Sequence, residues 1–149
     1  MCKSRRFNHF ILVFSIFMLL SSFSSAAGNK KVINFINEAC RSLAAGEYDD
    51  CISSCNKAMT IDPLCAAAYY TRGFAYRYKG DYDQSISDFN KAIQIDSRYA
   101  AAYYGRAKSY YYKREYDKAW EDLYKAKVLG CKVEDEFLRE LRKASGRKE

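Results

Sequence analysis

The sequence has few of the residues that interrupt helices or carry metal and acid-base chemistry. Its 149 residues include one proline, Pro63, and one histidine, His9. A single histidine excludes the imidazole clusters of zinc sites and the Ser-His-Asp and Cys-His arrangements of hydrolases. Nucleophile elbows and phosphate-binding loops are also absent. The sequence therefore predicts a protein that is not an enzyme and holds no metal or other cofactor.

Strong basicity is also missing. The chain has 25 basic and 18 acidic side chains, a net charge of +7, and three of the basic residues lie within the first 27 positions. Without that segment the net charge is 7 − 3, or about +4. Nucleic-acid binding normally needs a dense stripe of lysine and arginine. We expect no nucleic-acid partner.

The N-terminus has the three parts of a secretory signal peptide. Lys3, Arg5 and Arg6 precede an apolar run over 10–20, and small polar residues follow over 21–28. Residues 1–27 are interpreted as a signal peptide cleaved after Ala26 or Ala27, so the protein is expected to be periplasmic or secreted. The alternative is an uncleaved segment that anchors the chain in a membrane, although the apolar run is shorter than the about 20 residues of a transmembrane helix.

The rest of the chain repeats every 34 residues. Tyr48, Tyr82 and Tyr116 are separated by 82 − 48 = 34 and 116 − 82 = 34, which gives units over 32–65, 66–99 and 100–133. Small residues occupy positions 8, 20 and 27 of every unit: Ala39, Gly73, Ala107, Cys51, Ser85, Ala119, Ala58, Ala92 and Ala126. A fixed period of this length is typical of stacked-repeat proteins, and the small residues predict close helix crossings.

Each unit has the pattern of two helices joined by a turn. In the second unit, 66–79 has helical periodicity and Gly80 is suited to a left-handed helix end. Asp81 is expected to cap a second helix over 82–95, with Gln84 completing a capping box. Acids recur at this boundary in all units, so we expect them to cap the helix and to belong to the scaffold: Glu47, Asp49, Asp81, Asp83, Glu115 and Asp117.

The second unit carries the most specific motif, in which Tyr69, Gly73 and Tyr76 are followed by Gly80-Asp81-Tyr82 and by Phe89 and Ala92. With this motif the chain resembles the tetratricopeptide repeat family over 32–133. The resemblance implies an all-α, right-handed α-solenoid of helix-turn-helix repeats, with about seven helices in the mature chain. The sequence departs from the family at six positions: Glu38, Arg72 and Arg106 replace leucines, Arg114 replaces the turn glycine, and Ser97 and Cys131 replace the closing proline.

Flanking segments complete the expected organisation. Residues 28–31 are expected to be a short linker. Residues 134–144 place Phe137, Leu138 and Leu141 on one stripe and charged residues on the other face, which predicts a helix that caps the last unit. Residues 145–149 are expected to be a basic tail.

Five cysteines follow the signal segment: Cys40, Cys51, Cys55, Cys65 and Cys131. Cys51 and Cys55 lie four residues apart on one helix, and the favoured interpretation is that they are small buried hydrophobic residues. The alternative is a redox pair or metal site. An odd number of cysteines leaves at least one free or paired between chains, and a disulfide involving Cys40 or Cys65 stays open.

The resemblance also implies that the outer stripe of each first helix lines a concave, ligand-binding groove. In the second and third units this surface predicts a partner-binding site formed by Tyr70, Phe74, Arg77, Tyr78, Tyr104, Lys108, Tyr111 and Tyr112. Tyrosine and arginine are enriched at binding hot spots. The alternative is that some of these side chains fill the space between repeats.

One subfamily binds the C-terminal carboxylate of cytosolic chaperones with lysine, asparagine and arginine. The corresponding residues here are Ile36, Cys40, Thr71, Ala101 and Gly105. That carboxylate clamp is absent, so a chaperone-tail role is disfavoured.

These observations favour an exported protein-protein interaction adaptor that binds a peptide or a segment of a partner protein, with no small-molecule substrate. The alternative is a self-associating structural or assembly scaffold of the cell envelope, in which Cys131 links chains of a homo-oligomer.

Overall fold

The computed structural model describes residues 28–147, which form seven helices and no strand. The predicted signal segment over 1–27 and the last two residues of the tail lie outside this range. The first helix is described over 28–45. The others are α2 (Tyr48–Ile61), α3 (Ala66–Lys79), α4 (Tyr82–Ile95), α5 (Ala100–Tyr112), α6 (Tyr116–Val128) and α7 (Asp135–Ser145).

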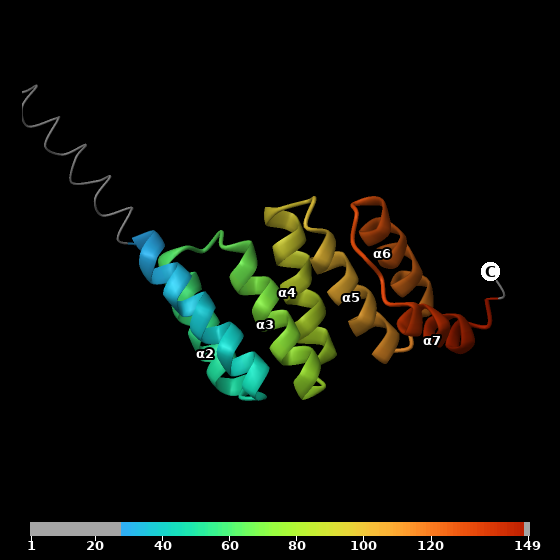
Figure 1. The fold of residues 1–149 in the computed structure, drawn as a ribbon, viewed down its shortest axis with the longest axis horizontal. Coiled ribbons are helices and arrows are strands. Elements are labelled where there is room, and N and C mark those ends of the chain that lie inside the picture. Colours follow the sequence, from blue (N-terminus) through green and yellow to red (C-terminus); the bar gives the residue numbers. More distant parts are fainter. Residues whose placement is uncertain (1–27, 148–149) are drawn as a thin grey trace, which may run out of the picture.

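The helices follow one another along the long axis of the molecule in chain order, as an α-solenoid does (Figure 1). α3 packs mainly on α4 and α5 mainly on α6, which are the helix pairs of the second and third units. Between units, α2 packs on α3 and α4 on α5. The expected all-α solenoid is therefore confirmed, and the expected helix bounds of the second unit are those of α3 and α4.

Small residues line the helix crossings, as their spacing predicts. All nine are buried. Ser85 and Ser109 face each other across α4 and α5 with their hydroxyl oxygens 2.8 Å apart, which satisfies two buried polar groups. Because no large side chain lies at these crossings, the helix backbones can approach closely.

The turns between paired helices use a left-handed residue. Gly80 has φ 86°, as expected, and Arg114 has φ 63° at the equivalent position of the third unit. Arg114 therefore holds a conformation that costs a non-glycine residue roughly 1–2 kcal/mol. The third unit therefore keeps the left-handed turn of the second unit, with backbone strain at Arg114.

Helix capping differs from the expectation. Glu47, Asp81 and Glu115 precede α2, α4 and α6, yet none makes a side-chain capping hydrogen bond. The predicted capping box at Asp81 is therefore wrong. The acids two residues further on pair with distant cations: Asp49 accepts a hydrogen bond from Lys79 and Asp83 from Lys113, both in the following unit, and Asp117 accepts one from Arg147 in the C-terminal tail.

Two arginines that depart from the family pattern form a second series of contacts between units. Arg106 donates to both carboxylate oxygens of Asp122 on the paired helix, at 2.7 and 2.6 Å, and also to Asn90 of the preceding unit. Arg72 makes the same contacts with Asp88 and with Asn56. Each arginine thus joins its own unit to the one before it.

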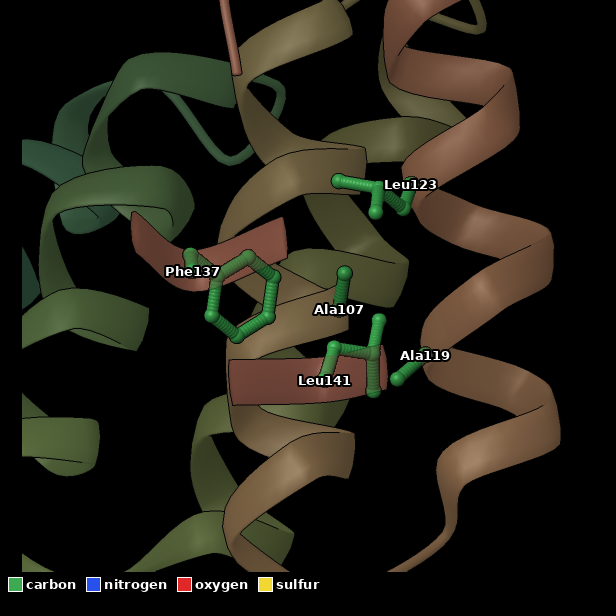
Figure 2. Close-up of a cluster of buried hydrophobic side chains, with 5 residues drawn as sticks. All are labelled: Ala107, Ala119, Leu123, Phe137 and Leu141. Atoms are coloured by element: carbon green, nitrogen blue, oxygen red, sulfur yellow. The ribbon is translucent and has the colours of Figure 1, made fainter. Parts of the chain in front are cut away.

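α7 closes the C-terminal end of the solenoid. It runs across α5 and α6, and its Phe137 and Leu141 are buried against Ala107, Ala119 and Leu123 (Figures 1 and 2). At the other end, residues 28–31, which were expected to be a linker, belong to the first helix. Val32 at their boundary is buried with Ala58 and Ala68, so the helix is held by packing on the first crossing.

All five cysteines of the described chain are free. Cys51 and Cys55 are fully buried in one core cluster, as the favoured interpretation predicts. The neighbouring Cys51 thiol and burial both raise the pKa of the Cys55 thiol, which favours its protonated form. Within 28–147 no group of histidines, cysteines and carboxylates is placed to hold a metal.

No helix of the described residues combines the length and the apolar character that crossing a membrane requires.

Candidate functional site

The eight predicted groove residues lie on α3 and α5, and the structure divides them by burial. Tyr78 and Tyr112 are 53% and 50% exposed. Arg77 is only 9% exposed. The other five side chains are partly buried: Tyr70, Phe74, Tyr104, Lys108 and Tyr111.

The α3 part of the surface is built on packed aromatic rings. Tyr70 lies 4.9 Å from Phe74 and stacks 4.9 Å from Tyr99, measured between ring centroids. Phe74 in turn meets the fully buried ring of Phe89 edge-on at 5.5 Å. Burial raises the pKa of Tyr70, and it raises that of Tyr99 to about 12. These rings therefore fill space between units and also form the floor of the surface.

Arg77 lies next to these rings in the last turn of α3. Its guanidinium carbon is 5.0 Å from the centroid of Phe74 and 4.4 Å from that of Tyr78, which is cation–π geometry. Its Nε is buried and has no hydrogen-bond partner. Among the ion pairs of residues 28–147, none includes Arg77.

The α5 part of the surface is partly covered by the chain that leads into α7. The ring of Phe137 lies 5.7 Å from Tyr104 and 5.5 Å from Tyr111. Lys108 lies 4.7 Å from the Tyr104 ring and donates to Glu134 at 2.9 Å. The hydrogen bond with Lys108 lowers the pKa of Glu134, and Arg77 contributes to the same shift. Arg77 stacks on Phe74, whose ring approaches Gly105 on α5, about one helical turn from Lys108.

The two most exposed members belong to a periodic stack. Tyr78 stacks on Tyr48 of the preceding unit at 5.6 Å, and Tyr112 stacks on Tyr82 at 5.3 Å, with interplanar angles of 7° in both pairs. Tyr48 and Tyr82 recur at the same position of successive units, so they belong to the repeated scaffold. The structure shows that one edge of the predicted site is attached directly to that scaffold.

Two residues of this surface were missed in the sequence. Tyr99 ends the second unit and Glu134 follows the third, so neither lies on the first-helix stripe used for the prediction. Position 34 of the unit, which is Cys65, Tyr99 or Val133, varies between copies, and that variation was the available signal.

Two surface cavities lie elsewhere. One of about 490 Å³ is lined by Tyr69, Arg72, Asp88 and neighbouring residues of α4, and one of about 340 Å³ lies at the turn between α5 and α6 beside Ser145. Neither of these two is lined by any of the eight predicted residues.

The fold, its 34-residue spacing and the paired helices define an α-solenoid of helical repeats. Residues 73–113 match the family model described as TPR repeat. No curated protein matches the chain at a significant level. The matched segment therefore carries a tetratricopeptide repeat, and the similar structures below have the same fold over most of the described chain.

Similar solved structures are tetratricopeptide domains of comparable size. The first such domain of Spaghetti (RPAP3), bound to the HSP90 peptide SRMEEVD, has a TM-score of 0.72 at 25% identity, covering 78% of this chain and 92% of that one. The Arabidopsis OM64 domain has a TM-score of 0.73 at 19% identity, with 78% and 98% covered. The TPR2B domain of yeast Sti1, in a complex with an Hsp70 peptide, has a TM-score of 0.68 at 22% identity, with 80% and 99% covered.

Proposed function

We propose that this protein is a non-enzymatic adaptor whose α3 and α5 surface binds a peptide or an extended segment of a partner protein. The observation that carries the proposal is the aromatic and cationic surface of the second and third units, where Tyr70, Phe74 and Tyr104 lie beside Arg77 and Lys108. Aromatic rings provide large contact area at low entropy cost, and arginine adds directional hydrogen bonds.

Similar domains support a peptide as the ligand. The solved structures of the Spaghetti and Sti1 domains hold HSP90 and Hsp70 peptides. In this chain the family's carboxylate-clamp positions hold apolar or small residues, among them Ile36, Thr71 and Gly105. We therefore propose a different peptide, recognised further along the surface, and not a chaperone tail.

Export is part of the proposal. The three-part signal pattern of residues 1–27 supports a periplasmic or secreted adaptor, with membrane anchoring by an uncleaved segment as the alternative. Mass measurement of the protein recovered from its producing cells tests this. We expect a chain that begins at Ala27 or Gly28, and a chain that still contains Met1 would contradict export by cleavage.

Photo-crosslinking followed by pull-down tests the binding surface. We expect Tyr78→Ala and Tyr104→Ala to lower partner capture at least about tenfold, because hot-spot aromatics contribute 2 kcal/mol or more. Tyr124→Ala is the matched control, since Tyr124 is 71% exposed on α6 and outside the surface. Equal capture by all three variants would exclude this site.

Self-association is a second candidate, favoured by apolar exposure at the first unit. Ile33, Ile61 and Leu64 are 59%, 40% and 68% exposed. Such side chains are suited to a contact between copies. Size measurement with and without reductant separates the candidates, because an adaptor is monomeric until its partner is added and a scaffold is not.

A further inference from the structure

We propose that the ligand of this surface carries an acidic side chain, which binds at a carboxylate subsite formed by Arg77 and Lys108, and that Glu134 occupies the Lys108 part of this subsite until the ligand displaces it. The inference rests on the proposed function and specifies the chemistry of the ligand. The subsite lies at the end of α3 and the middle of α5, away from the clamp positions of the family.

Arg77 is the first reason. A guanidinium that is 9% exposed, with a buried Nε that lacks a hydrogen-bond partner, has lost hydration without an ion pair in return. The rings of Phe74 and Tyr78 hold it by stacking, which fixes its position and leaves its donors unused. Arginine binds carboxylates with two parallel hydrogen bonds. A ligand carboxylate would bind the Nη groups, which form no ion pair within residues 28–147, whereas the buried Nε stays out of its reach.

Glu134 is the second reason. Its side chain is 65% exposed, while its partner Lys108 is only 19% exposed. An ion pair with one solvated member contributes little to stability, so a ligand carboxylate can replace it at low cost. Lys108 already pairs with a negative charge at this place, because it donates to Glu134 at 2.9 Å, and the same hydrogen bond lowers the pKa of Glu134. Glu134 therefore acts as an internal stand-in for the ligand.

The surrounding surface specifies a peptide and not a free anion. Tyr70, Phe74 and Tyr104 offer apolar ring faces next to the two cations. A small anion would leave these faces unused, whereas a peptide with an aspartate or glutamate beside an aromatic or aliphatic residue would cover them.

Selection of random phage-displayed 12-residue peptides on the full chain tests the proposal. We expect the selected peptides to be enriched in aspartate and glutamate. The best peptide should lose at least about tenfold in affinity for Arg77→Met, and the same loss should follow when its acidic residue is replaced by the amide. Arg142→Met is the matched control, because it removes one positive charge from an exposed position of α7 and should leave affinity unchanged.

Glu134→Gln gives an independent measurement. We expect affinity to rise about two- to fivefold, because Lys108 no longer has an internal counter-ion. Arg77→Met should keep or raise the midpoint of thermal unfolding, since it removes a buried polar atom that has no partner. If Arg77→Met unfolds the chain instead, the affinity of Glu134→Gln is the measurement that tests the subsite. Selected peptides without acidic enrichment, undiminished binding to Arg77→Met, or unchanged affinity of Glu134→Gln would overturn the subsite. Failure to select any peptide that Tyr104→Ala weakens would overturn the proposed function itself.

Discussion

Phe89 is the residue on which the centre of the solenoid is built. Its ring is fully buried and lies against two glycines, one on α3 and one on α5. A Cβ added at Gly105 would lie 2.6 Å from Phe89 Cζ, and one added at Gly73 would lie 3.1 Å from Cε1. The glycines therefore provide room for one large side chain that joins two units, and the same ring supports Phe74 of the candidate site.

Gly105→Ala should lower the free energy of unfolding by about 1–2 kcal/mol, because overpacking costs more than the helix propensity that alanine adds. The Phe89 ring is enclosed by Tyr70 and Phe74 and has no space into which it can move. Urea denaturation measures the effect. Gly73→Ala is the control with the looser contact and should be milder, while a Gly105→Ala protein as stable as the wild type would contradict this packing.

Tyr99 should make stability fall at alkaline pH. Burial raises its pKa to about 12, so the folded state keeps the neutral phenol while the unfolded chain ionises near pH 10. Its stabilising contribution is complete below about pH 10 and is lost as pH rises toward 12. Because the side chain is only partly buried, solvent screening leaves a loss on the order of 1 kcal/mol.

Thermal unfolding at pH 9 and pH 11 measures this loss, with absorbance of phenolate as the direct readout. Tyr99→Phe should show a smaller difference between the two pH values than the wild type. Tyr124→Phe is the control, since Tyr124 is exposed. Equal pH dependence of the wild type and Tyr99→Phe would exclude Tyr99 as the group responsible.

At the scale of the helix, two arginine–aspartate pairs, Arg72–Asp88 and Arg106–Asp122, join paired helices by hydrogen bonds and not by apolar packing. The side chains of Arg106 and Asp122 are 18% and 8% exposed, and Arg106 also stacks between Tyr103 and Tyr110. Arg72 and Asp88 repeat this arrangement, but the first unit has Glu38 and Ser54 at these positions. The series therefore joins the second and third units to their neighbours and fixes how each helix pair sits on the one before it.

A double-mutant cycle on Arg106→Met and Asp122→Asn tests the series. Each single change should destabilise the protein by about 2–3 kcal/mol, because it leaves a largely buried charge unpaired. The two changes together should cost less than the sum, with a coupling energy of about 1–2 kcal/mol from chemical denaturation. Additive losses would show that the pair contributes nothing beyond its separate packing.

At the scale of the whole molecule, α7 both completes the core and contributes to the candidate site. Leu141 is fully buried in the last core cluster, beside Phe137 (Figure 2). The ring of Phe137 also packs on Tyr104 and Tyr111 of α5. A terminal repeat exposes an apolar face unless another helix covers it. Glu134, which directly precedes α7, accepts a hydrogen bond from Lys108 of the candidate site. The segment that covers the end of the solenoid therefore also occupies part of that site.

Leu141→Ala should lower the free energy of unfolding by roughly 2–4 kcal/mol through loss of buried surface and formation of a cavity. Hydrogen exchange should show the loss first in α5 and α6, since stability in repeat proteins depends on nearest neighbours. Arg139→Ala on the exposed face of α7 is the control and should change stability by less than about 0.5 kcal/mol. Uniform loss of protection along all helices would contradict this local role.

Much of the fold followed from periodicity. Small residues line the helix crossings because only small side chains let the helix backbones approach closely. They occupy positions 8, 20 and 27 of each unit, for example Ala39, Ser85 and Ala126. Helix ends were predictable where one residue decides them, as at Gly80. The missing cap at Asp81 was not predictable, nor was the ion pair of its neighbour Asp83 with Lys113, because spacing along the sequence does not show which cation 30 residues away comes close.

The sequence predicted which helix face carries the candidate site, but it did not predict how the side chains of the site pack on one another. Tyr70 and Phe74 were placed on the outer face of α3, and their contacts with Tyr99 and Phe89 depend on how the next unit packs. Arg77 was expected as an accessible cation and is instead largely buried between rings. Local spacing gives the direction of a side chain, whereas its burial depends on neighbouring units.

The sequence by itself determined the repeat, the two helices of each unit and the small residues at their crossings, because these follow from spacing within a segment of 34 residues. Tertiary structure decided what depends on contacts between units. It placed Phe89 between two glycines, paired Asp49 and Asp83 with lysines of the following unit, and left the Nε of Arg77 buried without an acceptor. Such contacts join residues far apart in the chain, and no local pattern specifies them.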